Sequence, residues 1–157
     1  MLFPLFPKRP GTAPMRAMLV VEELWQVLTS PVGDLAWEKR VAELRATLER
    51  FVEGHTIDPK YLFLLYPTAD AVWEIRCTRE DPSIRVLGLF AAKDVFVATH
   101  YELRENLGGW ESREWKNVKK RAKARWRILF NTYPPICGAR VGTLVSGAAD
   151  GKYIRGA

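Results

Sequence analysis

Six basic or titratable residues lie in or beside three short apolar segments, and their side chains are of the types that cut RNA without a metal ion. RNA carries its own nucleophile, because its 2′-hydroxyl can attack the adjacent phosphate. A protein must then accept the hydroxyl proton, stabilise the added negative charge and protonate the leaving oxygen. Histidine exchanges a proton near neutral pH, and arginine donates paired hydrogen bonds to phosphate oxygens. The six candidates are Arg76, Arg85, Lys93, His100, Tyr101 and Arg104.

The same residues also fit ordinary structural roles. Arg76 and Arg85 can pair with acidic neighbours such as Glu74 across adjacent strands. His100 can be a hydrogen-bonded residue at the end of a strand. We name Arg76, Arg85, His100 and Tyr101 as the candidate catalytic group, with simple cross-strand pairing as the alternative.

Metal and cofactor motifs are missing from the sequence. No glycine-rich phosphate loop or paired CxxC is present, and the two histidines, His55 and His100, are too few for a histidine-based zinc site. Cys77 and Cys137 have neither metal-ligand spacing nor a disulfide pattern. No apolar run approaches the ~18 residues that cross a bilayer. We therefore expect a cytoplasmic protein without a metal ion, cofactor or membrane partner.

The positive charge is concentrated in one segment. The chain has a net charge of +6, and residues 110–130 contain eight lysines or arginines against two glutamates, so this segment accounts for the whole excess. Such a segment favours a polyanionic partner, with a solvated helix face as the alternative. We expect nucleic acid to contact its basic stripe, together with two residues nearer the strands. These are Lys116, Lys119, Lys120, Lys123 and Arg127, with Lys93 and Arg104.

Helical spacing dominates the first third of the chain. Residues 1–15 are broken by prolines and are interpreted as an irregular arm. Apolar residues three and four apart predict a helix over 16–29, although 19–21 also suits a strand. A second helix is predicted from an N-cap at Asp34 to Gly54, because its apolar residues repeat every three or four positions. They are Trp37, Val41, Leu44, Leu48 and Phe51. The two helices predict a helical hairpin.

Strand patterns follow at residues 72–77, 84–90 and 95–100. In the first, Trp73, Ile75 and Cys77 fall on one face, opposite Glu74 and Arg76. Short connections predict an antiparallel meander. A long basic helix then begins near residue 110 and ends at the Pro-Pro pair of residues 134–135. We predict an α+β domain over residues 16–136, with the helical hairpin packed on a small antiparallel sheet, and a Gly/Ala-rich tail over 137–157.

The strand segments carry a family resemblance. Residues 71–76, Ala-Val-Trp-Glu-Ile-Arg, resemble a strand of the RelE/HigB-like toxins, particularly their phage-derived branch. Residues 83–87 resemble the next strand, an arginine followed by apolar residues. Residues 94–101 resemble the third, which ends in a histidine or aromatic residue. Family members often place two lysines after it, where this chain has only Arg104 as a basic residue.

The resemblance implies a RelE/ParE-like fold and a ribosome-dependent mRNA endoribonuclease, inhibited by a cognate antitoxin. Carried over by position, Arg76 and Arg85 would bind the scissile phosphate, and His100 and Tyr101 would transfer protons or stack on a base. Two alternatives stay open: a non-enzymatic nucleic-acid-binding protein that uses the helix over 110–130, and a toxin-fold protein that inhibits a topoisomerase. The sequence leaves the oligomeric state undetermined.

Overall fold

A computed structural model of the chain describes all residues except 31, 58–59, 78, 80–82, 139 and 148–157. The described strands form one six-stranded sheet in the order β1-β2-β6-β5-β4-β3. Strand β2 runs parallel to β6, and the other neighbouring pairs are antiparallel. The strands are β1 Leu2–Pro4, β2 Ala17–Val21, β3 Leu62–Leu64, β4 Trp73–Arg76, β5 Ile84–Ala92 and β6 Val95–Leu103.

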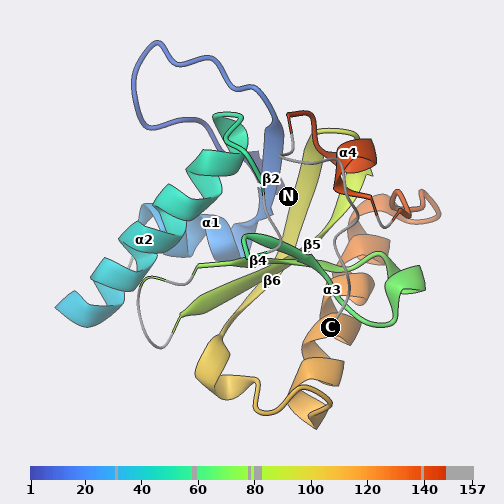
Figure 1. Cartoon of the computed structure of the whole chain (residues 1–157). Coiled ribbons are helices and arrows are strands. Elements are labelled where there is room, and N and C mark those ends of the chain that lie inside the picture. The colour runs from blue at the N-terminus through green and yellow to red at the C-terminus, as the bar shows by residue number, and fades with distance from the viewer. Residues whose placement is uncertain (31, 58–59, 78, 80–82, 139, 148–157) are drawn as a thin grey trace.

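Helices cover both faces of the sheet (Figure 1). Helices α1 (Glu22–Thr29) and α2 (Leu35–Val52) lie on one side and α3 (Arg113–Phe130) lies on the other. A short helix, α4 (Val141–Leu144), and two 3₁₀ turns, η1 (Thr68–Asp70) and η2 (Arg104–Asn106), complete the described elements. Two apolar cores result, one between the sheet and α1, α2 and α4, and one between the sheet and α3.

The prediction of an N-terminal helical hairpin on a small antiparallel sheet is wrong. The chain begins with strands β1 and β2, and Ala17–Val21 is a strand where the periodicity predicted a helix. Its aliphatic residues suit either element, and the backbone of β6, far along the chain, provides the parallel partner that favours the strand. The basic helix α3 is followed by the four-residue helix α4. The fold is therefore a mixed α+β arrangement around a mixed sheet.

The prediction of helix α2 is confirmed, including its N-cap. The Asp34 carboxylate accepts a hydrogen bond from the Trp37 backbone N–H at 2.9 Å, which satisfies a donor that the first helical turn leaves unpaired. The predicted stripe, which includes Val41, Leu44 and Leu48, is buried against the sheet. The antiparallel strands of the meander are confirmed as β4, β5 and β6.

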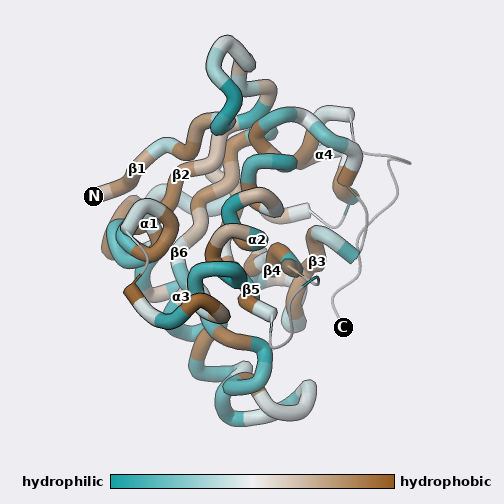
Figure 2. The backbone as a smooth tube through the Cα atoms, turned by 90° about the vertical axis from the view of Figure 1, so that its left-hand side faces the viewer, coloured by the Kyte–Doolittle hydropathy of each residue, from teal (hydrophilic) through white to brown (hydrophobic). Residues whose placement is uncertain are grey.

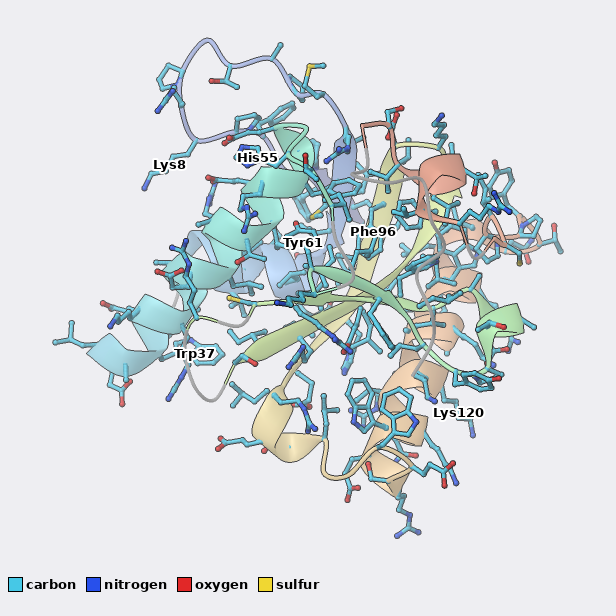
Figure 3. The ribbon with its side chains drawn as sticks, in the orientation of Figure 1. Lys8, Trp37, His55, Tyr61, Phe96 and Lys120 are labelled. Atoms are coloured by element: carbon cyan, nitrogen blue, oxygen red, sulfur yellow. The ribbon has the colours of Figure 1, made fainter. Side chains whose placement is uncertain are left out.

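Aromatic rings fill the core beneath α2. The Phe90 ring lies 5.8 Å from that of Trp73 and 5.1 Å from that of Phe96, which is labelled in Figure 3. Gly88 leaves room for this packing, because a Cβ there would lie 2.3 Å from the Val97 carbonyl oxygen and 2.5 Å from the Phe96 ring. Glycine is required at this position for the two strands to approach.

Both ends of the described chain contact the core. Strand β1 pairs with β2, and Leu5 is buried; Figure 2 shows the apolar segments of β1, β2 and α1 gathered together. At the other end, Val141 and Leu144 of α4 are buried. The buried Arg16 side chain donates to the Ser146 carbonyl oxygen at 2.6 Å. The Gly/Ala-rich tail predicted over residues 137–157 is thus packed on the core at residues 141–146, and residues 148–157 lie outside the described part.

Candidate nucleic-acid interface

The face of the sheet that α3 covers carries two rows of polar residues. Arg76, Arg85 and Glu102 lie opposite one another on β4, β5 and β6, so their side chains share one face. The next row contains Glu74 and His100, on either side of Leu87. Leu87, in this second row, and Leu89 beyond it belong to the apolar core under α3.

His100 reaches this face because of an irregularity in β6. The register shifts between Leu87, which pairs with His100, and Gly88, which pairs with Ala98. Thr99 is therefore an extra residue, and such a bulge reverses the alternation of side chains. Strict alternation from Phe96 and Ala98, which pack towards α2, would otherwise have placed His100 on the α2 side.

The same bulge turns Tyr101 to the face of the sheet opposite Arg76 and Arg85. It pairs with Val86 and packs against the core on the α1 and α2 side. Burial raises the pKa of its phenol, and Glu102 and Glu23 raise it further. The phenol therefore stays protonated near neutral pH. Tyr101 still lines the pocket beside His100, and the centroids of the two rings lie 6.5 Å apart.

Two arginines lie beside one buried carboxylate, and a third arginine, Arg104, lies near Arg85. Glu74 is 2% exposed, and its Oε1 lies 2.5 Å from Arg76 Nε and 4.0 Å from Arg85 Nη1. Burial lowers the pKa of Arg85, an effect that Glu74 opposes and that Arg76 and Arg104 reinforce. Cross-strand pairing, the alternative to catalysis, is therefore present here. Glu74 and Glu102 balance two of the three guanidinium groups, so the cluster keeps one positive charge beside the sheet end.

Polar atoms in this cluster lack partners. Among the described residues, the Glu74 Oε2, the Arg85 Nε and the Trp115 Nε1 are buried without a hydrogen bond. Arg76 lies over the Phe63 ring at 4.1 Å, and Arg104 lies 6.0 Å from the Trp115 ring. Arginines stacked on aromatic rings beside unused donors are suited to an anionic group.

A pocket of about 490 Å³ opens beside His100, along the side of α3 that carries Arg121 and Arg125. Burial lowers the pKa of the His100 imidazole, Glu102 and Glu23 oppose this shift, and Arg121 adds to it. Its Nε2 is buried and has no hydrogen-bond partner in the described chain. Arg121 and Arg125 also line the pocket, and Arg125 pairs with Glu23 at 3.1 Å. The pocket thus places a neutral imidazole beside two guanidinium groups.

Helix α3 is the strongest cationic feature of the described surface. Ser112 caps it by accepting a hydrogen bond from the Trp115 backbone N–H at 3.1 Å, and Trp115, Val118, Ala122 and Trp126 bury its apolar side. At about 100° per residue, the predicted nucleic-acid contacts fall on one flank. They are Lys116, Lys119, Lys120, Lys123 and Arg127, of which Lys116, Lys120 and Arg127 are exposed.

Two lysines of this flank connect α3 to the segment before β4. Lys123 forms an ion pair with Asp70 at 2.9 Å, and Lys119 donates to the Tyr66 carbonyl oxygen. Burial lowers the pKa of Lys119, and the neighbouring Lys116 and Lys123 lower it further against the effect of Asp70. Asp70 and Glu111 lie beside three ammonium groups, so this part of the surface keeps a net positive charge.

Lys93 lies apart from the remaining candidates. It occupies the turn between β5 and β6, eight residues beyond Arg85, which corresponds to roughly 26 Å along a strand. It lines a different pocket, with residues such as Met15 and Asp94. Arg104 follows β6 directly and belongs with the arginine cluster. The structure therefore groups Arg104 with Arg76 and Arg85 and leaves Lys93 outside.

Sequence reasoning missed four side chains that border these sites. Arg121 and Arg125 line the His100 pocket, and the exposed rings of Tyr66 and Trp110 lie beside Lys116 and Lys119. The four-residue spacing of the two arginines indicated a second basic flank of α3. The two glycines before Trp110 indicated an aromatic residue held in a loop rather than in a core.

Searches of protein-family models, of curated proteins and of solved structures found no match to this chain. Within the described ranges, no group of three or more histidine, cysteine or acidic side chains could hold a metal ion. No helix of the described chain is long and apolar enough to cross a membrane.

Proposed function

We propose that this protein binds RNA along the α3 flank and the adjoining arginine cluster. The observation that carries the proposal is the position of the five predicted lysine and arginine contacts on one flank of a single helix, three of them exposed. Arg104 joins the arginine cluster to the loop before α3, because it donates a hydrogen bond to the Gly108 carbonyl oxygen at 2.9 Å. A phosphodiester backbone carries one negative charge per nucleotide, so a continuous cationic surface matches it.

Exposed aromatic rings favour RNA with unpaired bases over duplex nucleic acid. Tyr66 is 58% and Trp110 36% exposed, beside the lysines of the flank. Aromatic side chains stack on bases that are splayed out of a helix, and single-stranded RNA presents such bases. Cations next to exposed rings therefore support a single-stranded partner.

A paired substitution tests this proposal. Lys116→Ala with Lys120→Ala removes two exposed cations from the flank, and Lys8→Ala with Arg9→Ala removes two exposed cations elsewhere. Lys8 and Lys120 lie on opposite sides of the molecule in Figure 3. Both variants lose the same charge, so they separate a local interface from general attraction.

Binding of a fluorescent 12-nucleotide RNA is measured between 50 and 200 mM salt. Each lost phosphate contact on a single strand lowers the salt slope by about 0.7. In the flank variant, the slope of log affinity against log salt concentration should therefore be smaller by about 1.4. Between 50 and 200 mM salt, the affinity of this variant should fall by a factor that is roughly sevenfold smaller than the factor for the wild type. The Lys8/Arg9 variant should retain the wild-type slope. Equal slopes in the two variants would refute the interface.

RNA cleavage is a second candidate, and the unpartnered imidazole of His100 favours it. The imidazole pKa is lowered, so the ring is neutral at pH 7. Its Nε2 is buried without a partner, and a rotation of the ring that brings this nitrogen to the pocket would let it accept a proton from a 2′-hydroxyl. Attack on phosphorus would form a 2′,3′-cyclic phosphate and break the bond to the 5′-oxygen, which would take the proton from the His100 imidazolium and leave as a 5′-hydroxyl. Arg121 and Arg125 could stabilise the developing charge from the same pocket.

The resemblance of residues 71–104 to RelE/HigB-like toxins makes ribosome-bound mRNA the substrate to test first. Such an enzyme would act in the cytoplasm and would be held inactive by a cognate antitoxin protein. Arg85 would then assist from beside the pocket, because it lies diagonally across from His100 on the neighbouring strand.

A translating extract with end-labelled mRNA tests cleavage. Wild-type protein should produce fragments with cyclic phosphate ends, and expression in bacteria should arrest growth. His100→Gln and Arg85→Ala should abolish both effects. His55→Gln provides the matched control, since His55 is half exposed beside Glu53 at the end of α2. Intact mRNA with the wild-type protein would reject cleavage and leave the binding proposal standing.

A further inference from the structure

A pocket of about 450 Å³ lies at the start of α3, within the size range of small-ligand sites. It forms where the loop before α3 meets the segment that precedes η1. Two aromatic residues, two lysines, one proline and one glutamate line it: Tyr66, Pro67, Trp110, Glu111, Lys116 and Lys119.

The loop that presents Trp110 is held by several contacts. Leu107 is fully buried, and its carbonyl oxygen accepts a hydrogen bond from the Ser112 hydroxyl. Arg104 donates to the Gly108 carbonyl oxygen at 2.9 Å, and Gly108 adopts a φ of +64° that favours glycine. The ring of Trp110 lies 5.6 Å from that of the buried Trp115. An exposed ring is thus fixed before any ligand arrives, which reduces the entropy lost on binding.

Cations border the same ring. The Lys119 ammonium lies 5.9 Å from the centre of the Trp110 ring and donates to the Tyr66 carbonyl oxygen. Lys116, one turn earlier, is exposed at the pocket wall. Rings beside ammonium groups are the arrangement that binds a base together with its phosphate.

Glu111 is the one acidic side chain in this lining. It is exposed and makes no hydrogen bond or ion pair with the described residues, although two lysines line the same pocket. Guanine, alone among the four RNA bases, presents two adjacent N–H donors, N1–H and N2–H, on its Watson–Crick edge. A carboxylate has two acceptor oxygens that match this pair.

We propose that the pocket binds an unpaired guanine of single-stranded RNA. Tyr66 and Trp110 contact the faces or edge of the base, Glu111 accepts from N1–H and N2–H, and Lys116 and Lys119 contact the adjoining phosphate. Because base pairing occupies the Watson–Crick edge, a duplex cannot present it. This inference rests on the RNA binding proposed above and assigns it a base preference.

The test compares four 12-nucleotide RNAs, which are oligouridine with a central G, A or C, and oligouridine alone. Wild-type protein should bind the G-containing strand about tenfold more tightly than the other three, since a good paired contact discriminates by ~1–3 kcal/mol. Glu111→Gln should bind all four within twofold of one another. Glu114→Gln removes the same charge from the first turn of α3, outside the pocket, and should keep the preference for G.

The aromatic contribution is tested with Trp110→Ala and Trp110→Phe. The alanine variant should lose the tenfold preference, and the phenylalanine variant should keep most of it, since a ring remains. Circular dichroism confirms that each variant is folded. Equal binding of the four RNAs by the wild type, with binding still sensitive to Lys116 and Lys120, would overturn the guanine site alone. No binding of any RNA would overturn the proposed function as well.

Discussion

Replacing Glu74 with glutamine should destabilise the fold by about 3 kcal/mol, because it removes the buried counter-charge of an arginine cluster. The carboxylate is 2% exposed and lies 2.5 Å from Arg76 Nε and 4.0 Å from Arg85 Nη1. Removing one partner of a buried ion pair costs ~3–5 kcal/mol. Arg76 keeps 25% of its side chain exposed, so water reduces the loss to the lower end of that range.

Urea denaturation at pH 7 measures this loss. With a slope of about 2 kcal/mol per molar urea, a 3 kcal/mol loss moves the midpoint of unfolding by about 1.5 M. Glu23→Gln serves as the control, since Glu23 pairs with Arg125 at 3.1 Å but is 59% exposed. Exposed pairs contribute ~0–1 kcal/mol. A Glu74→Gln midpoint within about 0.25 M of the wild type would refute the view that Glu74 neutralises the cluster.

Two further stability predictions follow from His100 and Gly88. The pKa of His100 in the folded protein lies below the usual 6.5. Between the folded-state and unfolded-state pKa values, the unfolded chain therefore binds more protons than the folded chain. The free energy of unfolding should then fall as the pH drops below 6.5, and it should fall more steeply in the wild type than in His100→Gln. Denaturation midpoints at pH 7.5, 6.5 and 5.5 measure this, and identical profiles for the two proteins would contradict it. Gly88→Ala should cost at least about 2 kcal/mol, because its Cβ would lie 2.3 Å from the Val97 carbonyl oxygen. Gly109→Ala, whose Cβ would meet no atom within 4 Å, should leave the melting temperature nearly unchanged, and equal melting temperatures for the two variants would refute the steric argument.

Local patterns predicted the elements that depend on local chemistry. The alternation in residues 73–77 placed Trp73 and Ile75 in one core and Glu74 and Arg76 on the other face, as the structure confirms. The spacing of apolar residues predicted α2, and the Asp34 cap forms as expected. In each case the residues that decide the structure are close together in the sequence.

Non-local pairing and one inserted residue account for what the sequence did not predict. Residues 17–21 became a strand because β6 lies beside them, and nothing within the segment itself identifies that partner. The extra residue Thr99 decides which face of the sheet each side chain takes: it turns His100 to the face that carries Arg85 and turns Tyr101 to the opposite face, whereas the candidate site had grouped all three. The pocket at Trp110 depends on a loop meeting residues 66–67, a contact that no spacing rule indicates.

Lysine footprinting tests the central claim most directly, because it locates bound RNA on the folded wild-type protein without any substitution. Lysines are acetylated with and without a single-stranded RNA, and their modification is measured by mass spectrometry. RNA should protect the exposed Lys116 and Lys120 of α3, and it should leave Lys8 and Lys93, which lie away from that flank, as reactive as before. Protection of Lys8 or Lys93 with Lys116 and Lys120 still reactive would contradict the proposed interface.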